Sequence, residues 1–386
     1  GVGPFAYLPG YNFGSGTAYL DGQLITGIAA RGLPVTRLTW VKSAISNIGL
    51  DFNLWAGKLS GSLEVFRRDL TGIPAPRYDV LLPIEVGFTA PSENLNANRT
   101  LGIEMALNHA GKAGSVEYSV GVNATLARLR NRYTYKPRFG NSIDRYRNSI
   151  EDRWARINWG YEFIGQFQSV EQIANYPVDV DGQNNATLLP GDFIYKDQNN
   201  DGVIDGLDER PNGYSEGNLP YLNFGLNSSF AYKGFDLLLN FSGATMQSRG
   251  RAAELKLPFQ NDANSPDFLL NDRWHHEDIF DPTSPWVPGT YPALKKSNNE
   301  SNQRASSFWF RNTSYLRLRN LQLGYNLPQK WLKSLSITKV RIYANGFNLF
   351  SIDNLSDIGV DPETQLNTGL EYPSVRVYNL GVNLTF

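Results

Sequence analysis

The most chemically distinctive stretch of the sequence is a run of oxygen-bearing side chains at residues 197–208 (DQNNDGVIDGLD). Oxygen donors stand at positions 1, 3 and 5, a glycine at 6, a backbone carbonyl at 7 and a carboxylate at 12, which is the pattern of a calcium-binding loop. Position 12 is aspartate rather than glutamate, so its bidentate reach is shorter. The run predicts a structural Ca²⁺ or Mg²⁺ site that pins a long loop, with an ion-free Asx-rich turn as the alternative. The predicted ligands are Asp197, Asn199, Asp201, Val203 and Asp208.

A second candidate is a stretch rich in aromatic residues and histidine further along the chain. His275 and His276 are adjacent, so they do not share a face as metal ligands spaced i, i+4 do, and we do not expect a metal there. Aromatic rings in an outward loop can stack on sugars or fill an interface with a partner, and the plain alternative is that they pack the loop onto itself. The candidate substrate or partner residues are Trp274, His275, Trp286, Tyr291 and Trp309.

Signatures of catalysis do not appear in the sequence. There is no Ser-His-Asp order, no HExxH motif and no phosphate-cradling glycine loop. The 386 residues contain no cysteine, which removes thiol nucleophiles and thiolate metal sites together. The formal net charge is −1 without a long basic run, so nucleic acid is not an expected partner. We therefore expect a protein that is not an enzyme and has no catalytic residues.

The segments between these loops have the two-residue period of β-strands. Residues 116–126 are the clearest example, because Val, Tyr, Val, Val, Ala and Leu alternate there with polar residues and glycine. No run approaches the ~18 apolar residues of a membrane helix, whereas a barrel strand needs only alternate apolar residues. Residues 315–326 mix the two phases, which indicates a bulge. The pattern predicts nine strands, at 37–54, 59–69, 101–108, 116–126, 222–230, 235–241, 315–326, 339–350 and 374–386.

The connections between the predicted strands alternate in length. Short ones, at 55–58, 110–114, 232–234 and 327–335, alternate with long ones, at 73–98, 131–217, 249–313 and 351–373. Outer-membrane barrels have short periplasmic turns and long outer loops. Residues 37–386 are therefore predicted to form part of an all-β, transmembrane antiparallel barrel, preceded at 1–36 by a Gly-rich, irregular outer loop or fragment start.

Helices are expected only inside the longest loop, near residues 149–159 and 169–176. Ser169 and Gln172 fit a capping box for the second of them.

Nine is an odd number of strands, and single-chain bacterial barrels have even numbers. An open sheet has two unpaired edges, and each unpaired backbone group in a bilayer costs several kcal/mol. We therefore expect the strands at 37–54 and 374–386 to pair with strands outside this sequence. The opening GVGPFAYLPG has no Met, charged region or apolar run of a signal peptide, which also favours a fragment.

Several motifs, taken in their order and spacing, resemble the SusC/RagA-like TonB-dependent outer-membrane transporters. The resemblance runs from about residue 38 to the end and rests on NIGLDF (47–52), GQFQS (165–169), GDFIYKD (191–197), DGVID (201–205), YKGFD (232–236), LRLRN (316–320), LGY (323–325) and NLF (348–350).

The resemblance implies a barrel of about 22 strands in the bacterial outer membrane, plugged by an amino-terminal domain. Such a transporter imports oligosaccharides or peptides with energy delivered through TonB, and works with a SusD-like surface lipoprotein. This sequence matches only the carboxyl-terminal part of that barrel. The plug, the TonB-contacting segment and the earlier strands have no counterpart in it, so transport cannot be assigned to these residues alone.

Outer-membrane lipid, the lipoprotein and the missing barrel strands are the expected partners, with loops 131–217 and 249–313 as the outer surface. Two other functions compete with this interpretation: a passive porin-like barrel, and a soluble β-rich carbohydrate-binding or hydrolytic protein.

Overall fold

The computed structural model describes residues 5–77, 79–216, 219–259, 264–295, 300–332, 337–364, 369–372 and 374–386. Its largest sheet has nine strands in the order β19-β18-β17-β12-β11-β6-β5-β4-β3. In the described part of the chain, no helix is both long and apolar enough to cross a membrane. The expected all-β fold is confirmed.

The nine strands correspond one to one with the nine predicted segments. Several are longer than predicted, β5 by eight residues at its start, because polar residues continue the strand beyond the apolar band. Their bounds are β3 (Lys42–Leu54), β4 (Leu59–Ala75), β5 (Glu93–Ala113), β6 (Val116–Tyr133), β11 (Leu222–Tyr232), β12 (Phe235–Thr245), β17 (Tyr315–Asn326), β18 (Lys339–Asp353) and β19 (Val377–Thr385).

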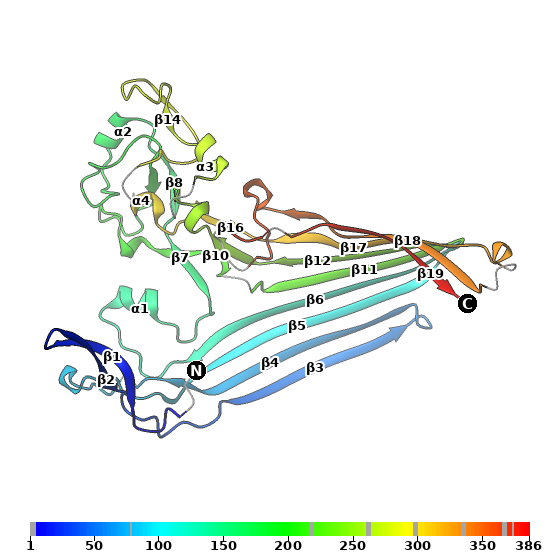
Figure 1. The fold of residues 1–386 in the computed structure, drawn as a ribbon, viewed down its shortest axis with the longest axis horizontal. Coiled ribbons are helices and arrows are strands. Elements are labelled where there is room, and N and C mark those ends of the chain that lie inside the picture. The colour runs from blue at the N-terminus through cyan, green and yellow to red at the C-terminus, as the bar shows by residue number, and fades with distance from the viewer. Residues whose placement is uncertain are drawn as a thin grey trace. The chain divides into compact units, whose positions relative to one another are not determined.

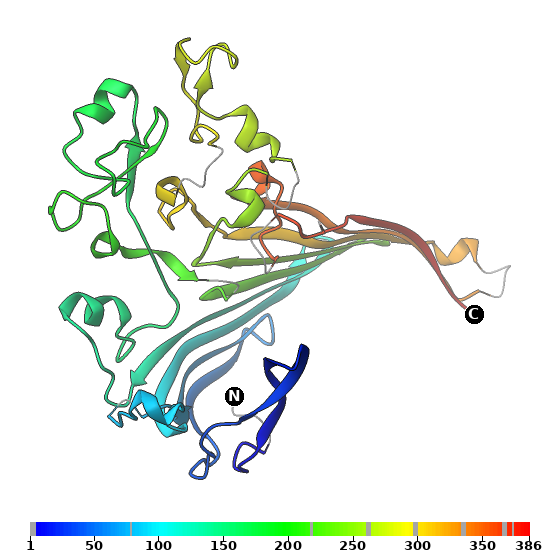
Figure 2. The same cartoon turned by 60° about the vertical axis from the view of Figure 1, so that its left-hand side comes forward.

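The chain forms two compact units, which we describe separately. The first comprises residues 1–49, 64–103 and 127–155, and the second 50–63, 104–126 and 156–386. Strands β3 to β6 contribute residues to both units. In the second unit, β11, β12, β17, β18 and β19 run side by side, and the long insertions gather beyond one end of them (Figures 1 and 2).

The register of the second unit separates an apolar from a polar face. Leu226 lies opposite Val122 of β6 on one side and Phe241 of β12 on the other. Leu239 lies opposite Leu321. Because side chains alternate across a strand, the intervening residues share the other face. There Asn240 donates to the Asn227 side chain at 2.6 Å. The apolar row continues to β19 through the pairs Leu323 with Ala344 and Ala344 with Leu380.

The turn between β11 and β12 fixes this register. Lys233 and Gly234 both have positive φ, at 46° and 92°. A two-residue hairpin turn with two positive φ values matches the twist of the strands, and glycine adopts that conformation without steric cost. The two strands then pair over their whole length, from Tyr232 with Phe235 to Leu222 with Thr245.

The predicted bulge in β17 is confirmed. The register of β17 shifts between Leu318 and Asn320 against β18, and the register of β12 shifts at the same level. An extra residue in a strand moves the apolar set from even to odd positions. Leu318 and Leu321 therefore face the same side although they are three positions apart.

Residues 1–36 are not wholly irregular, which corrects the expectation for this segment. Strand β1 (Tyr11–Leu20) pairs with β2 (Gln23–Ala30) as an antiparallel hairpin. Gly14 and Gly16 have φ values of 83° and 82°, and the register shifts between Phe13 and Thr17. This irregularity interrupts the two-residue period, which hid the hairpin in the sequence.

The helix expected near 149–159 was misplaced. Helix α1 (Ser142–Asn148) begins earlier, where the Asn141 side chain accepts a hydrogen bond from the Asp144 backbone N–H at 2.8 Å. Residues 157–160 instead form strand β7.

The second predicted helix is confirmed as α2 (Val170–Ala174). Ser169 caps it, accepting from the Gln172 N–H at 3.1 Å, but the Gln172 side chain accepts from Gln168 rather than from Ser169.

We predict that arginine at Val120 damages barrel assembly more than arginine at Ser119. Val120 shares the apolar row, opposite Ser228, whereas Ser119 lies on the polar face. An arginine facing lipid near the bilayer midplane costs ~2–4 kcal/mol. Folding into lipid vesicles, followed by the shift of the heat-modifiable band, measures the difference. Equal damage from both variants would contradict a barrel wall with one lipid face.

Candidate functional site

The long insertions of the second unit fold into one packed body, which we call the loop body (residues 157–216, 247–259, 264–295 and 300–312). A sheet of order β16-β13-β10-β7 supports it. Figure 1 shows α2, α3, α4 and β14 grouped around these strands, beyond the ends of β11, β12 and β17. The further bounds are β7 (Ile157–Gly160), β8 (Phe163–Gln166), β9 (Phe193–Tyr195), β10 (Arg210–Glu216), β13 (Gln247–Gly250), η3 (Ala253–Leu255), α3 (Asp267–Asn271), β14 (His275–His276), β15 (Trp286–Val287), α4 (Glu300–Gln303) and β16 (Phe310–Asn312).

Aromatic rings form the core of the loop body. The Phe193 ring lies 4.4 Å from the Phe308 ring and 5.0 Å from the Phe163 ring, measured between centroids. Tyr195 is buried as well, and its hydroxyl donates to the Ser301 carbonyl at 2.7 Å. The loop body thus has a hydrophobic core of its own, formed by Tyr161, Phe167, Ile173, Val180, Leu188, Phe193, Ile194, Tyr195, Ile204, Leu269, Tyr291 and Trp309.

Three of the five predicted aromatic or histidine contact residues lie inside the loop body. Trp274, Tyr291 and Trp309 are only 3%, 6% and 2% exposed. For these three, the structure favours the alternative in which the rings pack the loop onto itself. His275 and Trp286 lie on the β14–β15 hairpin and are half-buried.

The tip of the β14–β15 hairpin presents apolar side chains that the sequence analysis missed. Ile279 is 63% exposed and Phe280 is 90% exposed. Both stand between Asp278 and Asp281, whose carboxylates accept hydrogen bonds from turn N–H groups. An apolar pair inside an acidic turn was the available sequence signal.

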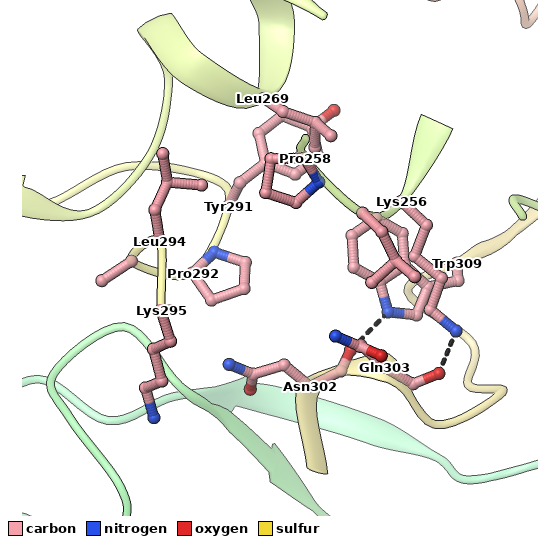
Figure 3. A pocket seen from close by; sticks show the side chains of 12 residues that line it. Lys256, Pro258, Leu269, Tyr291, Pro292, Leu294, Lys295, Asn302, Gln303 and Trp309 are labelled. Carbon is pink, nitrogen blue, oxygen red and sulfur yellow. Dashed lines mark hydrogen bonds between the residues drawn. The ribbon is translucent and has the colours of Figure 1, made fainter. Parts of the chain in front are cut away.

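A buried carboxylate joins the two insertions that make the loop body. Asp192 is fully buried, accepts from the Asn302 amide at 2.7 Å and forms an ion pair with Lys295. The neighbouring cavity of about 60 Å³ is lined mainly by apolar side chains, with Lys256 and Trp309 on one side and Pro292 on the other (Figure 3). Burial lowers the pKa of Lys256 to about 8. A cavity of this size has room for water molecules but not for a sugar or a peptide.

The predicted cation loop is closed by its own hydrogen bonds. Both carboxylate oxygens of Asp197 accept backbone N–H groups, from Asn200 at 2.6 Å and Gly202 at 2.9 Å. Asp208 is fully buried and accepts from the N–H groups of Gln198 and Asp205. In the ranges that the structure covers, no three acidic or histidine side chains gather closely enough to hold a metal ion. The structure thus does not bring Asp197, Asp201 and Asp208 together, and the cation site stays a prediction.

A second acidic turn packs against the cation loop, and sequence reasoning did not identify it. The N–H of Ile204 donates to the Asp179 carbonyl at 2.9 Å, and the N–H of Asp179 donates to the Gly202 carbonyl at 2.8 Å. Two residues on, Asp181 holds its own turn. Burial would raise the pKa of Asp181, but hydrogen bonds from Thr187 and from backbone N–H groups lower it to about 2.

A cavity with polar walls lies on the polar face of the sheet. Its volume is about 190 Å³, and it opens where β11, β12 and β17 meet the loop body. Arg249 of β13 is buried at this cavity, its guanidinium donates to the Thr364 carbonyl, and burial lowers its pKa. The lining residues are Pro220, Asn223, Ala244, Gln247, Arg249, Tyr315, Pro362 and Glu363.

An ion network of the last loop closes one side of this cavity. Arg317 is buried and pairs with Asp361 at 2.7 Å and with Glu363 at 2.5 Å. Tyr315 also donates to Glu363, at 2.7 Å. Burial alone would raise the pKa of Asp361, but the hydrogen bond from Arg317 holds it below its usual range. Arg317 and Arg319 lie on the polar face, where both form ion pairs with carboxylates of the last loop.

No protein-family model matches the chain. Among curated proteins, it is similar to TonB-dependent receptor P3 of Formosa agariphila, with 25% identity over 97% of the chain and 37% of the relative. It is also similar to the TonB-dependent receptor SusC of Bacteroides thetaiotaomicron, with 23% identity over 99% of the chain and 36% of the relative. The chain therefore spans little more than a third of the length of these relatives.

Solved structures of the RagAB peptide importer share the fold. The chain superposes on its open-open state with a TM-score of 0.68 and 17% identity, over 100% of this chain and 38% of that chain. A second structure, of the RagAB peptide transporter, gives a TM-score of 0.68 at 18% identity, over 100% of this chain and 39% of that chain. The relatives are receptors and importers, so the expectation that the chain is not an enzyme is confirmed. In sequence and fold, the chain is similar to the carboxyl-terminal part of the barrel of SusC/RagA-like TonB-dependent transporters, which are proteins of the bacterial outer membrane.

Proposed function

We propose that this chain is the carboxyl-terminal wall of an importer that carries oligosaccharides or peptides through the outer membrane with energy from TonB. The observation that carries the proposal is the exposed apolar surface on both edge strands. Leu380 of β19 is 87% exposed and Ile48 of β3 is 82% exposed. Contiguous apolar rows of this kind are rare on water-soluble proteins and match a lipid-facing band. This observation argues against the soluble alternative.

The two edge strands also support the proposal that further strands complete the barrel. Among the described residues, β3 and β19 are the ends of the sheet and do not pair with each other. A bilayer leaves no water to satisfy open edges, so both edges need partner strands. We propose that such strands correspond to parts of the relatives that this chain does not cover.

The polar face is the side along which we propose the nutrient passes. Its 190 Å³ cavity contains a buried arginine, a phenol and amide side chains, which can hydrogen-bond both sugar hydroxyls and peptide groups. The relatives named above are a SusC receptor and a peptide importer, so both substrate classes remain within the proposal.

We predict that Asn223→Trp slows nutrient uptake by the full-length transporter several-fold, because the indole fills the polar-face cavity. Leu226→Trp is the matched control, since Leu226 lies on the same strand in the apolar row. Uptake of labelled oligosaccharide or peptide into cells measures the effect. Unchanged uptake with Asn223→Trp would contradict a route along this face. Uptake that persists after deletion of the TonB-contacting segment would instead support a passive porin.

A SusD-like lipoprotein is the proposed partner of the loop body. The exposed Ile279 and Phe280 at the hairpin tip supply an apolar anchor of the kind found at interface centres.

We predict that Phe280→Ala weakens co-purification of the lipoprotein with the full-length transporter. Trp331→Ala is the control, because Trp331 is 58% exposed on the short connection between β17 and β18. Pull-down at increasing salt and detergent compares the two variants. A loss caused by Trp331→Ala rather than by Phe280→Ala would place the partner on the short-turn side and invert the proposed topology.

We also propose that Ca²⁺ or Mg²⁺ reinforces residues 197–208. The support is the spacing of oxygen donors together with the exposed position of Asp201, whereas the buried Asp208 would have to release a backbone N–H group to join the coordination. Hard cations of this type bind at oxygen distances of about 2.0–2.6 Å.

The paired variant Asp197→Ala and Asp201→Ala should increase proteolysis within the loop body while the barrel still assembles. Chelator should have the same effect on the unmodified protein, and added Ca²⁺ should reverse it. If proteolysis is the same with and without chelator, the loop is an ion-free turn.

A further inference from the structure

Arginines follow the apolar rows on three neighbouring strands. On β6, the alternate positions that hold Val120, Val122 and Leu126 continue with Arg128, Arg130 and Arg132. On β5, the alternate positions from Leu107 to Leu101 lead to Arg99. On β4, those from Leu59 to Val65 lead to Arg67. In each strand the change from apolar to basic occurs toward the long-loop end.

The length of strand between the short-turn end of the apolar row and the first arginine matches the thickness of a membrane. On β6, Tyr118 lies near the short-turn end of the apolar row, and the first arginine is ten residues on, at Arg128. Ten residues of a strand span about 33 Å. At a tilt of about 40°, that length covers about 25 Å along the membrane normal, the height of the apolar band of an outer-membrane barrel. The arginines therefore lie at the level of the outer headgroups, on the side that faces lipid.

Within the first unit, four of these arginines share two carboxylates. Arg130 and Arg132 share the single carboxylate of Asp152, at 2.9 Å and 2.7 Å. Arg67 and Arg99 share Asp69, each at 2.6 Å. The Arg128 guanidinium lies 4.4 Å from the centre of the Trp154 ring. Arg67, Arg99, Arg130 and Arg132 thus carry a positive surplus over these two carboxylates. Arg128 lies beside an aromatic ring of the kind that favours membrane interfaces.

The loop that carries Asp152 and Trp154 does not need the excess positive charge of these arginines to stay attached to β6. Backbone hydrogen bonds already hold residues 153–155 to β6, from the Asn131 N–H to the Arg153 carbonyl at 2.8 Å and from the Ala155 N–H to the Leu129 carbonyl at 2.9 Å. Guanidinium groups bind phosphate oxygens in a bidentate fork, and pairs that share one carboxylate keep N–H groups for a second anion.

We propose that Arg67, Arg99, Arg128, Arg130 and Arg132 form a belt that binds the phosphorylated headgroups of outer-leaflet lipids. The proposal rests on the proposed function, in which the apolar row faces lipid and the long loops lie on the outer side of the membrane. The belt anchors this wall of the barrel at a fixed depth, and Asp69 and Asp152 space its guanidinium groups.

The test uses the full-length transporter purified from outer membranes in mild detergent. The lipid phosphate retained per protein molecule is measured for the unmodified protein and for the variant Arg128→Gln, Arg130→Gln and Arg132→Gln. Each basic residue removed beside an anionic lipid surface is expected to lower retention by up to about fivefold. The corresponding triple lysine variant should keep most of the lipid, because it keeps the charge.

Arg68→Gln is the matched control, since Arg68 lies on the opposite face of β4, where its Nε donates to Ser43 at 3.1 Å. Equal lipid retention in the glutamine variant and the unmodified protein, with both barrels assembled, would overturn the proposal. So would an equal loss in the Arg68→Gln control.

A second measurement covers the case in which the glutamine variant does not assemble. The unmodified protein is placed in bilayer discs that contain either a phosphorylated glycolipid or the same lipid after phosphatase treatment. The belt predicts a higher Tm with the phosphorylated lipid, no such shift from inorganic phosphate, and a smaller difference at high salt. Equal Tm values in the two lipids contradict the belt. Neither assay contains a nutrient, so a failure of the transport proposal would be distinguishable from a failure of this one.

Discussion

The need to satisfy every backbone N–H and carbonyl within the sheet is the constraint on which the rest of this structure depends. Strands that cross a bilayer can meet it only through neighbouring strands. The nine-stranded sheet does so for its inner members, and its two edge strands present apolar side chains beside unpaired backbone groups. The strand pairing from Val122 to Leu380, whose register shifts at the β17 bulge, and the tight hairpin turn at Lys233 and Gly234 both serve this requirement.

The long insertions lie beyond the ends of the strands and, like a water-soluble domain, are stabilised by a hydrophobic core of their own. Phe193 and its neighbours supply a hydrophobic core, and the buried Asp192 is compensated by Lys295 and Asn302. A buried carboxylate is tolerable only with such partners. Because the partners come from a different insertion, the charge also specifies how the two insertions dock. The β14–β15 hairpin and the polar-face cavity are thus held on a packed support.

The polar face is organised by charge rather than by apolar packing. Arg317 would be costly to bury alone, and Asp361 and Glu363 from the last loop offset that cost. The bulge at β17 contributes to this arrangement, because it reverses the facing of the strand between Leu318 and Leu321. Side chains of the LRLRN segment therefore lie on both faces of the sheet: Leu318 on the apolar face and Arg317 in the ion network of the polar face.

We could predict from the sequence the nine strands, their faces, the alternation of short and long connections and the family resemblance, because each depends on a local two-residue period or a local motif. Tertiary structure alone decided what the loop residues do. Trp274 and Trp309 were predicted as contact aromatics but are buried, and Asp208, whose role as a cation ligand stays a prediction, accepts backbone hydrogen bonds from Gln198 and Asp205. The β1–β2 hairpin was hidden by glycines that break its period, and α1 begins earlier than its pattern indicated. The physical reason is that burial and hydrogen-bond partners in a long loop come from residues about a hundred positions away, as with Asp192 and Asn302.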